Sequence, residues 1–335
     1  MVKTEHLQTI LHAYGLPGRI LQVLPLEEMK EKNERRILYR VDLQNGLQLV
    51  CRISREERYP RTLIEQQCTF SEKLRAYGLP TARKYPLCGG KGGYVFEFQQ
   101  GHVTLEQYAG ADVDRADPDM LEQLGVLLGR MHRVSEQDPS PIDYAPVCGA
   151  IRQGRATFER ILARSDPALL QREDVRAAQV LHDGLVCRLR ATLDQLPHGA
   201  VHGDLGVFNN LVTADGKLSI IDFNLAADEP FLCDLLSCFY SSIHKYTWRD
   251  RWSGIDHRQA LEGFLHGYAS RRTLTGVERE QFCLVAALFD GLFYCKALLE
   301  EYGDTGDPLV LEGFRAAAEK FDPSRHGFSQ ETGSG

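Results

Sequence analysis

The sequence predicts an α+β protein in which a small strand-rich part precedes a larger helical part. Three observations indicate this class. Before residue 101, apolar and polar residues alternate with period two, as they do in strands that bury one face. After residue 101, apolar residues recur with the spacing of amphipathic helices. No internal repeat divides the 335 residues, and this length suits one large domain or two modest ones.

The strand-rich part contains a predicted β-hairpin. Residues 36–43 and 47–53 alternate in polarity, and Asn45-Gly46 lies between them. Asn-Gly between two alternating runs is the strongest short-range signal for a tight hairpin turn. We therefore expect two antiparallel strands at these positions.

A helix and a further strand follow this hairpin. The helix is expected from about residue 62 to residue 77, because Gly78 and Pro80 then end it. We interpret the glycine-rich run 89–93 as a turn, since its lysine precedes neither Ser nor Thr and its spacing differs from that of a Walker loop. Residues 94–98 then form a strand.

Helical patterns dominate the remainder of the chain. One apolar helix face is formed by Leu121, Leu124, Leu127, Leu128 and Met131. Further helices are expected at about 152–163, 174–193, 258–271 and 277–302. The polar, glycine-rich end is expected to fray. The predicted division is a strand-rich lobe 1–101, a helical lobe 102–321 and a flexible tail 322–335.

Composition excludes several classes of protein. Hydrophobic residues make up 43% and charged residues 25%, which is the balance of a folded soluble chain. The net charge of -7 argues against a nucleic-acid or anionic-membrane partner. Nine cysteines without a Cys-x-x-Cys pair favour free thiols in a reducing compartment. The apolar stretch 282–299 contains Asp290 and Lys296, and no signal-peptide core follows Met1, so we expect a cytoplasmic protein.

Polar residues that suit phosphoryl transfer lie between positions 201 and 223. Asp204 is followed by Asn209 five residues later, and Asp222 comes thirteen residues after that. The intervening apolar runs predict a hairpin that can bring these groups to one side. One carboxylate can orient or accept the proton of an acceptor hydroxyl, while an amide oxygen and a carboxylate hold Mg²⁺. Hard oxygen ligands suit Mg²⁺ rather than zinc. The alternative is that both aspartates only form turns or caps.

These residues occur in a pattern that resembles the aminoglycoside phosphotransferase-like superfamily, which includes homoserine and choline kinases. The matching motifs are His202-Gly203-Asp204, Asn209, Ile221-Asp222-Phe223 and Asp234-Leu235. The resemblance implies a bilobal protein-kinase-like fold, with a small antiparallel sheet and one main helix in the N-lobe, a mostly helical C-lobe and an active cleft between them. It also implies that Asp204 is the catalytic base, that Asn209 and Asp222 bind Mg²⁺, and that His202 and Asp234 give structural support.

The strand-rich part resembles the nucleotide-binding lobe of the same superfamily. Arg52 lies where the family carries a phosphate-contacting cation, often Lys, and a guanidinium can bind phosphate bidentately. By the same likeness its helix partner is Glu65, with Glu72 as a competitor. Glu97 and Phe98 are expected at the interlobe hinge, with their backbone groups at the adenine edge. The alternatives are that Arg52 is only an exposed arginine on a strand, and that Glu97 and Phe98 belong to a simple buried strand.

Two further segments bear on the resemblance. Residues 27–36, where kinases cover the phosphates with a glycine-rich loop, contain no glycine. Either Lys30, Lys32 or backbone amides reach the phosphates, or the loop stays open until substrate binds, or the charged run is only solvated. Residues 124–132 resemble the family's central helix, in which we interpret His132 as a packed strut.

The resemblance implies an ATP- or GTP-dependent kinase for a hydroxyl on a small polar molecule, such as an aminoglycoside, an amino alcohol, a homoserine-like compound or a sugar. Asp222-Phe223 is followed by Asn224, and no Ala-Pro-Glu follows, which argues against a peptide acceptor. A nucleotide-binding pseudokinase and a metal-dependent hydrolase are the alternatives, and the oligomeric state stays open. A pocket for a cationic acceptor is expected to be lined by Asp228, Glu229, Glu300, Glu301, Asp304 and Asp307, and an ordinary acidic surface is the favoured alternative for the last four.

Overall fold

The computed structural model describes residues 4–31, 34–55, 59–89, 92–99, 101–113, 118–153, 173–213, 216–247, 256–302 and 316. Contacts within the chain divide it into two units. The first unit comprises Met1–Val113, Asp138–Tyr144 and Phe208–Ala226. The second comprises Asp114–Gln137, Ala145–Val207 and Ala227–Gly335. The predicted division into lobes 1–101 and 102–321 stays a prediction, and the predicted tail 322–335 lies outside the described residues.

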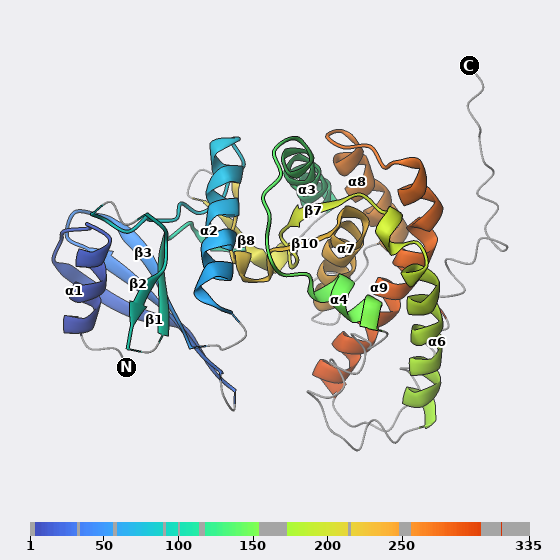
Figure 1. Ribbon diagram of the computed structural model, residues 1–335, viewed down its shortest axis with the longest axis horizontal. Coiled ribbons are helices and arrows are strands. Elements are labelled where there is room, and N and C mark those ends of the chain that lie inside the picture. Colours follow the sequence, from blue (N-terminus) through green and yellow to red (C-terminus); the bar gives the residue numbers. More distant parts are fainter. Residues whose placement is uncertain are drawn as a thin grey trace. The chain divides into compact units, whose positions relative to one another are not determined.

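The first unit contains a five-stranded antiparallel sheet with the order β1-β2-β3-β5-β4 (Figure 1). The bounds of its strands are β1 Ile20–Glu31, β2 Glu34–Leu43, β3 Gln48–Arg55, β4 Phe96–Phe98 and β5 Gly101–Gln107. The hairpin predicted around Asn45-Gly46 is confirmed as β2–β3. Its turn places Gly46 at a positive φ of 83°, a conformation that glycine adopts without steric cost.

Alternation along these strands puts their apolar residues on one face of the sheet. Cys51 and Ile53 of β3 and Val103 and Leu105 of β5 join one buried cluster. Helix α1, Thr4–Ala13, adds Leu7, Ile10 and Leu11 to the same cluster. The sequence predicted one main helix beside the sheet, and α1 is a second, shorter one. Burial of this face is the main apolar stabilisation of the sheet.

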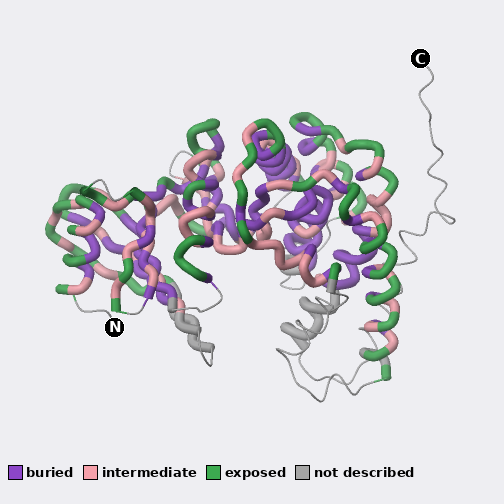
Figure 2. Tube along the Cα trace, viewed as in Figure 1, coloured by how far each residue is buried: buried purple, intermediate pink, exposed green. Residues whose placement is uncertain are grey.

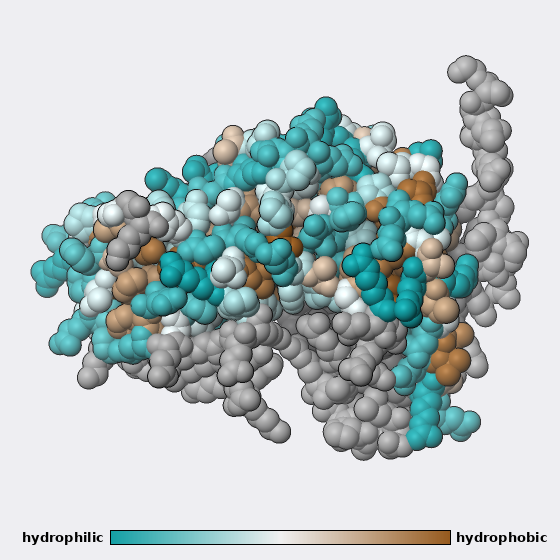
Figure 3. All heavy atoms as spheres, in the orientation of Figure 1, coloured by the Kyte–Doolittle hydropathy of each residue, from teal (hydrophilic) through white to brown (hydrophobic). Residues whose placement is uncertain are grey.

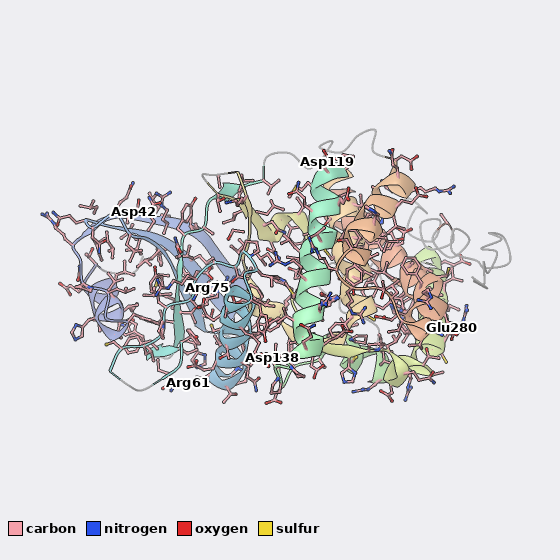
Figure 4. The ribbon with its side chains drawn as sticks, turned by 90° about the horizontal axis from the view of Figure 1, so that it is seen from above. Asp42, Arg61, Arg75, Asp119, Asp138 and Glu280 are labelled. Atoms are coloured by element: carbon pink, nitrogen blue, oxygen red, sulfur yellow. The ribbon has the colours of Figure 1, made fainter. Side chains whose placement is uncertain are left out.

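Helix α2, Arg61–Ala76, is the main helix of the first unit and matches the predicted one. Figure 4 labels Arg61 and Arg75, which lie in its first and last turns. The helix ends where the chain reaches Gly78, whose φ is 78°. Phe70 on its buried face meets the ring of Phe223 edge to face, at a centroid distance of 6.0 Å.

The sheet extends beyond residue 101, where the sequence predicted a change to helices. Strand β5 begins at Gly101 and pairs with β4 and β3. The turn between β4 and β5 is tight, because Phe98 is paired with Gly101. Gln99 takes a positive φ of 48° in this turn, which is uncommon for a residue other than glycine. No Asn-Gly or Asp-Gly signal marks it in the sequence.

A second, three-stranded sheet completes the first unit and has the order β6-β8-β9. Its strands are β6 Ala111–Asp112, β8 Asn210–Val212 and β9 Leu218–Ile220, and β8–β9 is the hairpin predicted within 201–223. Gly110 precedes β6 at a φ of 154°, and a Cβ there would lie 2.2 Å from the Val212 carbonyl oxygen. Only glycine fits at this close approach of the two backbones.

The second unit is mostly helical. Strands β7, His198–Val201, and β10, Ala227–Pro230, form a short antiparallel pair within it. Its helices are α3 Pro118–Gln137, α4 Pro146–Gln153, α6 Glu173–Arg190, α7 Phe231–Thr247, α8 His257–Ala269 and α9 Gly276–Tyr302. Three of the predicted helices correspond to α6, α8 and α9, whereas most of the helix predicted at 152–163 lies outside the described residues.

Two glycines let α3 and α8 approach closely. A Cβ at Gly125 of α3 would lie 2.1 Å from the Phe264 carbonyl oxygen, and one at Gly267 of α8 would lie 2.1 Å from the Glu122 carbonyl oxygen. The apolar stripe predicted for α3 is buried, and Figure 2 shows buried residues along much of this helix. The close approach matters for the site because α3 carries His132 and α8 carries Tyr268.

Hydrophilic side chains cover most of the described surface that is visible in Figure 3, with hydrophobic ones scattered among them. None of the helices in the described part of the chain is long and apolar enough to cross a bilayer.

Candidate active site

The first predicted site residue, Asp204, lies in the second unit just after strand β7. The β7–β10 ladder ends with Val201 opposite Ala227, and the chain then turns through Gly203, whose φ is 78°. His202 is fully buried, and its Nδ1 accepts a hydrogen bond from the Asp204 N–H at 3.4 Å. Asp204 itself is half-buried. A short loop with a buried histidine thus presents the carboxylate.

Asp234 anchors this loop from the first turn of α7. Its Oδ1 accepts a hydrogen bond from the Gly203 N–H at 2.9 Å. Its Oδ2 lies 2.9 Å from Nε2 of His132 on α3, and both side chains are almost completely buried. A carboxylate is also favoured at a helix N-terminus by the backbone dipoles. This geometry supports the structural role predicted for Asp234, and we call its two contacts behind the Asp204 loop the brace.

The brace continues as a chain of buried polar groups. His132 Nδ1 lies 2.9 Å from the Tyr268 hydroxyl, which accepts from Arg272 Nη1 at 2.8 Å. With Nε2 of His132 protonated toward Asp234, Nδ1 is the acceptor and Tyr268 donates to it. Arg272 pairs with the buried carboxylate of Glu278 at 3.0 Å. Burial raises the pKa of Tyr268 well above its usual range, so the phenol stays a donor.

Asn209 and Asp222 lie in the first unit, at the open end of the β8–β9 hairpin. Asn210 is paired with Ile220, and the Ile221 N–H donates to the Asn209 carbonyl at 3.0 Å. The two predicted metal ligands therefore leave adjacent strands at the same end. Asp222 is in the left-handed region, with φ 61° and ψ 63°. Such strain in a residue other than glycine persists only where the surroundings hold it.

Arg52 contacts Asp222 within the first unit. Its Nη2 lies 3.1 Å from Asp222 Oδ1, and the guanidinium is buried, with 8% of the residue exposed. In the sheet Arg52 is opposite Thr104 of β5. The residue predicted to contact phosphate is thus placed beside a residue predicted to bind the metal. Their contact shows that this end of the hairpin accommodates a positive charge next to the carboxylate.

In the described contacts, neither Glu65 nor Glu72 pairs with Arg52. Glu65 accepts from the backbone N–H groups of Tyr94 and Val95, at 2.6 and 3.0 Å. Glu72 accepts from the Lys84 N–H at 2.6 Å and lies 2.7 Å from a guanidinium nitrogen of Arg75. The carboxylates instead satisfy backbone N–H groups of the segment between α2 and β4, which has few strand partners of its own.

Gln67 is the α2 residue that reaches the segment after Asp222. Its Nε2 donates to the carbonyls of Asn224 and Ala226, at 2.7 and 3.1 Å. The sequence analysis missed this residue, because no local pattern separates it from the neighbouring Gln66. A small pocket beside it is lined by Arg52, Ser54, Tyr59, Ile64, Gln67, His102, Thr104 and Asn224.

Glu97 and Phe98 belong to β4, an edge strand that turns back into β5. The Glu97 carboxylate is exposed and lies 3.4 Å from Arg61 Nη1, whereas the Phe98 ring centroid lies 5.3 Å from that of the His6 ring of α1. Strand β5 then continues to Gln107. The expected place of Glu97 and Phe98 at the hinge, with backbone groups at the adenine edge, stays a prediction.

The oxygen-donor set suits a divalent cation. Asn209 offers an amide oxygen and Asp222 a carboxylate, and both are ligand types that Mg²⁺ and Ca²⁺ prefer. The positively charged Arg52 guanidinium already contacts Asp222 Oδ1. In the described part of the chain, no group of three or more His, Cys, Asp or Glu side chains is arranged to hold a metal.

The acidic residues suggested for a cationic acceptor have different environments. Glu229 is buried and accepts from the N–H groups of Val147 and Cys148, at 2.6 and 2.9 Å, so it caps α4. Burial raises the pKa of Glu229. Asp228 has a buried Oδ1 that finds no hydrogen-bond partner in the described part of the chain. The side chains at positions 300, 301, 304 and 307 lie outside what the structure describes.

Comparison with known proteins supplies an independent finding. A family model described as "Phosphotransferase enzyme family" matches residues 26–280. A homoserine kinase of Methylorubrum populi is 27% identical over 177 residues, which are 50% of this chain and 48% of that enzyme. The chain thus spans about half the length of that relative.

Solved structures show the same fold. The complex of amicoumacin kinase hAmiN with AMP-PNP, Ca²⁺ and Ami is similar to this chain with a TM-score of 0.62 and 17% identity, over 93% of each chain. An aminoglycoside phosphotransferase from Alicyclobacillus acidocaldarius has a TM-score of 0.61 and 13% identity, over 96% of this chain and 93% of that one. At these identities the likeness establishes the architecture, an α+β fold of the phosphotransferase type.

Proposed function

The chain belongs to the phosphotransferase enzyme family, and from this premise we propose that it transfers the γ-phosphate of ATP or GTP to a hydroxyl of a small polar molecule. The observation that carries the proposal is the placement of Arg52 on Asp222, at the end of the hairpin that also bears Asn209. Phosphoryl transfer needs a cation and a metal site close together, because negative charge on the transferring group must be neutralised.

Each site residue has a distinct role in this proposal. Asp204 orients the acceptor hydroxyl and accepts its proton. Asn209 and Asp222 hold the divalent cation, which supplies charge neutralisation at the phosphates when it is bound. Arg52 exchanges its contact with Asp222 for phosphate oxygens, which a guanidinium binds bidentately.

His202 and Asp234 act on the shape of the Asp204 loop rather than on substrate. Asp234 fixes the Gly203 N–H, and buried His202 accepts from the Asp204 N–H, so the carboxylate is held before substrate arrives. Preorganised geometry of this kind lowers the cost of reaching the reactive arrangement.

We further propose that the acceptor carries an ammonium group besides its hydroxyl. The similar protein from Methylorubrum populi is named a homoserine kinase, and an amino acid alcohol has both groups. Asp228 supports this class, because a buried carboxylate oxygen without a partner is unfavourable until a donor reaches it. Because ATP is a cytosolic metabolite, the predicted cytoplasmic location suits this activity.

The experiment that tests the activity is an acceptor panel with γ-labelled ATP and Mg²⁺. The panel contains L-homoserine, a short amino alcohol, an aminoglycoside and a sugar without an amine. We expect labelled product with at least one amine-bearing hydroxyl compound. Nucleotide binding without transfer to any of them contradicts the proposal and favours a pseudokinase.

A matched variant tests the acceptor class separately. Asp228→Asn is expected to raise KM for the amine-bearing acceptor about tenfold, because a charge-assisted hydrogen bond becomes a neutral one, while KM for ATP is unchanged. Asp183→Asn, which changes a half-exposed aspartate on α6, serves as the control. An equal effect of both variants argues against a specific role for Asp228.

A further inference from the structure

A side chain of α2 forms two hydrogen bonds to the segment after Asp222. Gln67 is buried, with 4% of the residue exposed, and its Nε2 donates to the carbonyls of Asn224 and Ala226. The short 3-10 turn Phe223–Leu225 begins directly after Asp222. The Asn224 carbonyl lies within this turn, and the Ala226 carbonyl follows it. Both N–H groups of the amide are therefore used on the same turn.

The conformation of Asp222 makes such a restraint necessary. Its left-handed backbone is unfavourable for a residue with a Cβ. The turn that follows has no cap from the Asp222 side chain. The Phe70–Phe223 ring contact supports its apolar side, but an edge-to-face contact of 6.0 Å does not fix the direction of a carbonyl. Hydrogen bonds do.

The two carbonyls at this position require a hydrogen-bond donor. Two carbonyl oxygens are acceptors, and a carboxylate facing them would present only further acceptors and a negative charge. The glutamates on either side of Gln67 in α2 cannot substitute for it. Glu65 is bound to the N–H groups of Tyr94 and Val95, and Glu72 to that of Lys84.

We propose that Gln67 is a positioning residue for the metal-binding carboxylate, acting through its two hydrogen bonds to the turn that follows Asp222. The inference rests on the proposed phosphotransferase function and deepens it. A neutral amide of α2 is thus hydrogen-bonded to the proposed metal-binding turn. Without this donor, the Asp222 backbone can leave its left-handed conformation. The fraction of molecules in which the Asp222 carboxylate is placed to bind the cation then falls, and metal affinity falls with it.

The test measures metal affinity directly and does not need turnover. Wild-type protein and Gln67→Met, which keeps the volume and removes the donor, are titrated with Mn²⁺ at saturating AMP-PNP, and free Mn²⁺ is followed by electron paramagnetic resonance. We expect about tenfold weaker Mn²⁺ binding by Gln67→Met, the effect of losing a buried hydrogen bond. AMP-PNP affinity without metal is expected to be unchanged. Gln66→Met, which removes a hydrogen bond to Asp143 instead, is expected to bind Mn²⁺ like the wild type.

Three outcomes decide the inference. Wild-type Mn²⁺ affinity in folded Gln67→Met overturns it and leaves the proposed function intact. Absence of Mn²⁺ binding by wild-type protein with AMP-PNP overturns both. If Gln67→Met does not fold, Gln67→Asn is used, because it keeps the donor but is one methylene too short for both carbonyls. Weaker Mn²⁺ binding by Gln67→Asn then supports the inference, and unchanged binding overturns it.

Discussion

The two segments that carry the predicted site residues are held by different chemistry. In the second unit, the Asp204 loop is fixed by a carboxylate, Asp234, which is itself bonded to His132, a residue in contact with Tyr268. In the first unit, the turn after Asp222 is fixed by a neutral amide and a ring contact. Asp222 also forms an ion pair with Arg52, which is a proposed ligand of substrate.

This difference predicts that substitutions in the two segments will have different effects. The groups behind the Asp204 loop are buried and bonded to one another, so removing one of them leaves others unsatisfied. In the proposed function the Arg52–Asp222 contact is exchanged, with phosphate replacing Asp222 at Arg52 and a divalent cation replacing Arg52 at Asp222. We therefore expect changes behind Asp204 to lower stability strongly, and changes around Asp222 to alter metal binding.

The largest expected effect comes from Asp234→Ala. It leaves the Gly203 N–H and the His132 ring N–H buried without an acceptor, so we expect a loss of roughly 3–5 kcal/mol in the free energy of unfolding. Urea titration measures this loss. Asp194→Ala, which removes an exposed pair with Arg152, is the control and should change stability by less than about 1 kcal/mol. Similar losses in the two variants would contradict the proposed brace.

A smaller effect is expected where α3 meets α8. In Gly267→Ala the new Cβ meets the Glu122 carbonyl, which forces the helices apart and should cost about 1–3 kcal/mol. Gly263 is one turn earlier on α8 and has nothing within 4 Å of a Cβ. Gly263→Ala should therefore stabilise by about 0.5–1 kcal/mol, because alanine is the better helix former. Thermal unfolding shows whether each variant is stabilised or destabilised. A change in the same direction in both variants would contradict the described contact between α3 and α8.

The smallest effect concerns pH and the helix that carries Gln67. Burial raises the pKa of the Cys68 thiol from 9.0 to about 12. Because the folded pKa is the higher one, this thiol contributes stability below pH 9 that is lost as pH rises toward 12. The loss for one thiol is about 1.4 kcal/mol per pH unit within this window.

Cys68→Ala should therefore lose less stability between pH 9.5 and 10.5 than the wild type does, by about 1.4 kcal/mol. Cys88→Ala changes an exposed cysteine and should follow the wild type. Urea titrations at the two pH values make this comparison. Parallel losses in all three proteins would show that Cys68 does not titrate as its burial requires.

Local patterns in the sequence predicted the elements that depend on local chemistry. Asn45-Gly46 marked the β2–β3 turn, and Gly78 marked the end of α2. The β4–β5 turn was missed because Gln99 adopts its positive φ without the usual glycine or asparagine signal. Strand β5, which follows this turn, was therefore not predicted either.

The motif indicated the residues that we propose to carry the chemistry, but not the contacts that hold them in place. Arg52 and Asp222 are 170 residues apart in the chain, and no periodicity specifies such a pair. Gln67 and Gln66 are adjacent and chemically identical, and only the packing of α2 shows which one faces the turn after Asp222. Contacts made over long sequence distances depend on the tertiary structure, so local patterns do not reveal them.

In the proposed mechanism Asp204 acts on the acceptor while Asp222 holds the metal. Measuring the transfer rate and Mn²⁺ affinity of Asp204→Asn and Asp222→Asn side by side tests it most directly. We predict that Asp204→Asn lowers kcat by about 10²–10⁴-fold with unchanged Mn²⁺ affinity, as expected for loss of a general base, and that Asp222→Asn weakens Mn²⁺ binding. Transfer by Asp204→Asn at the wild-type rate would contradict the claim.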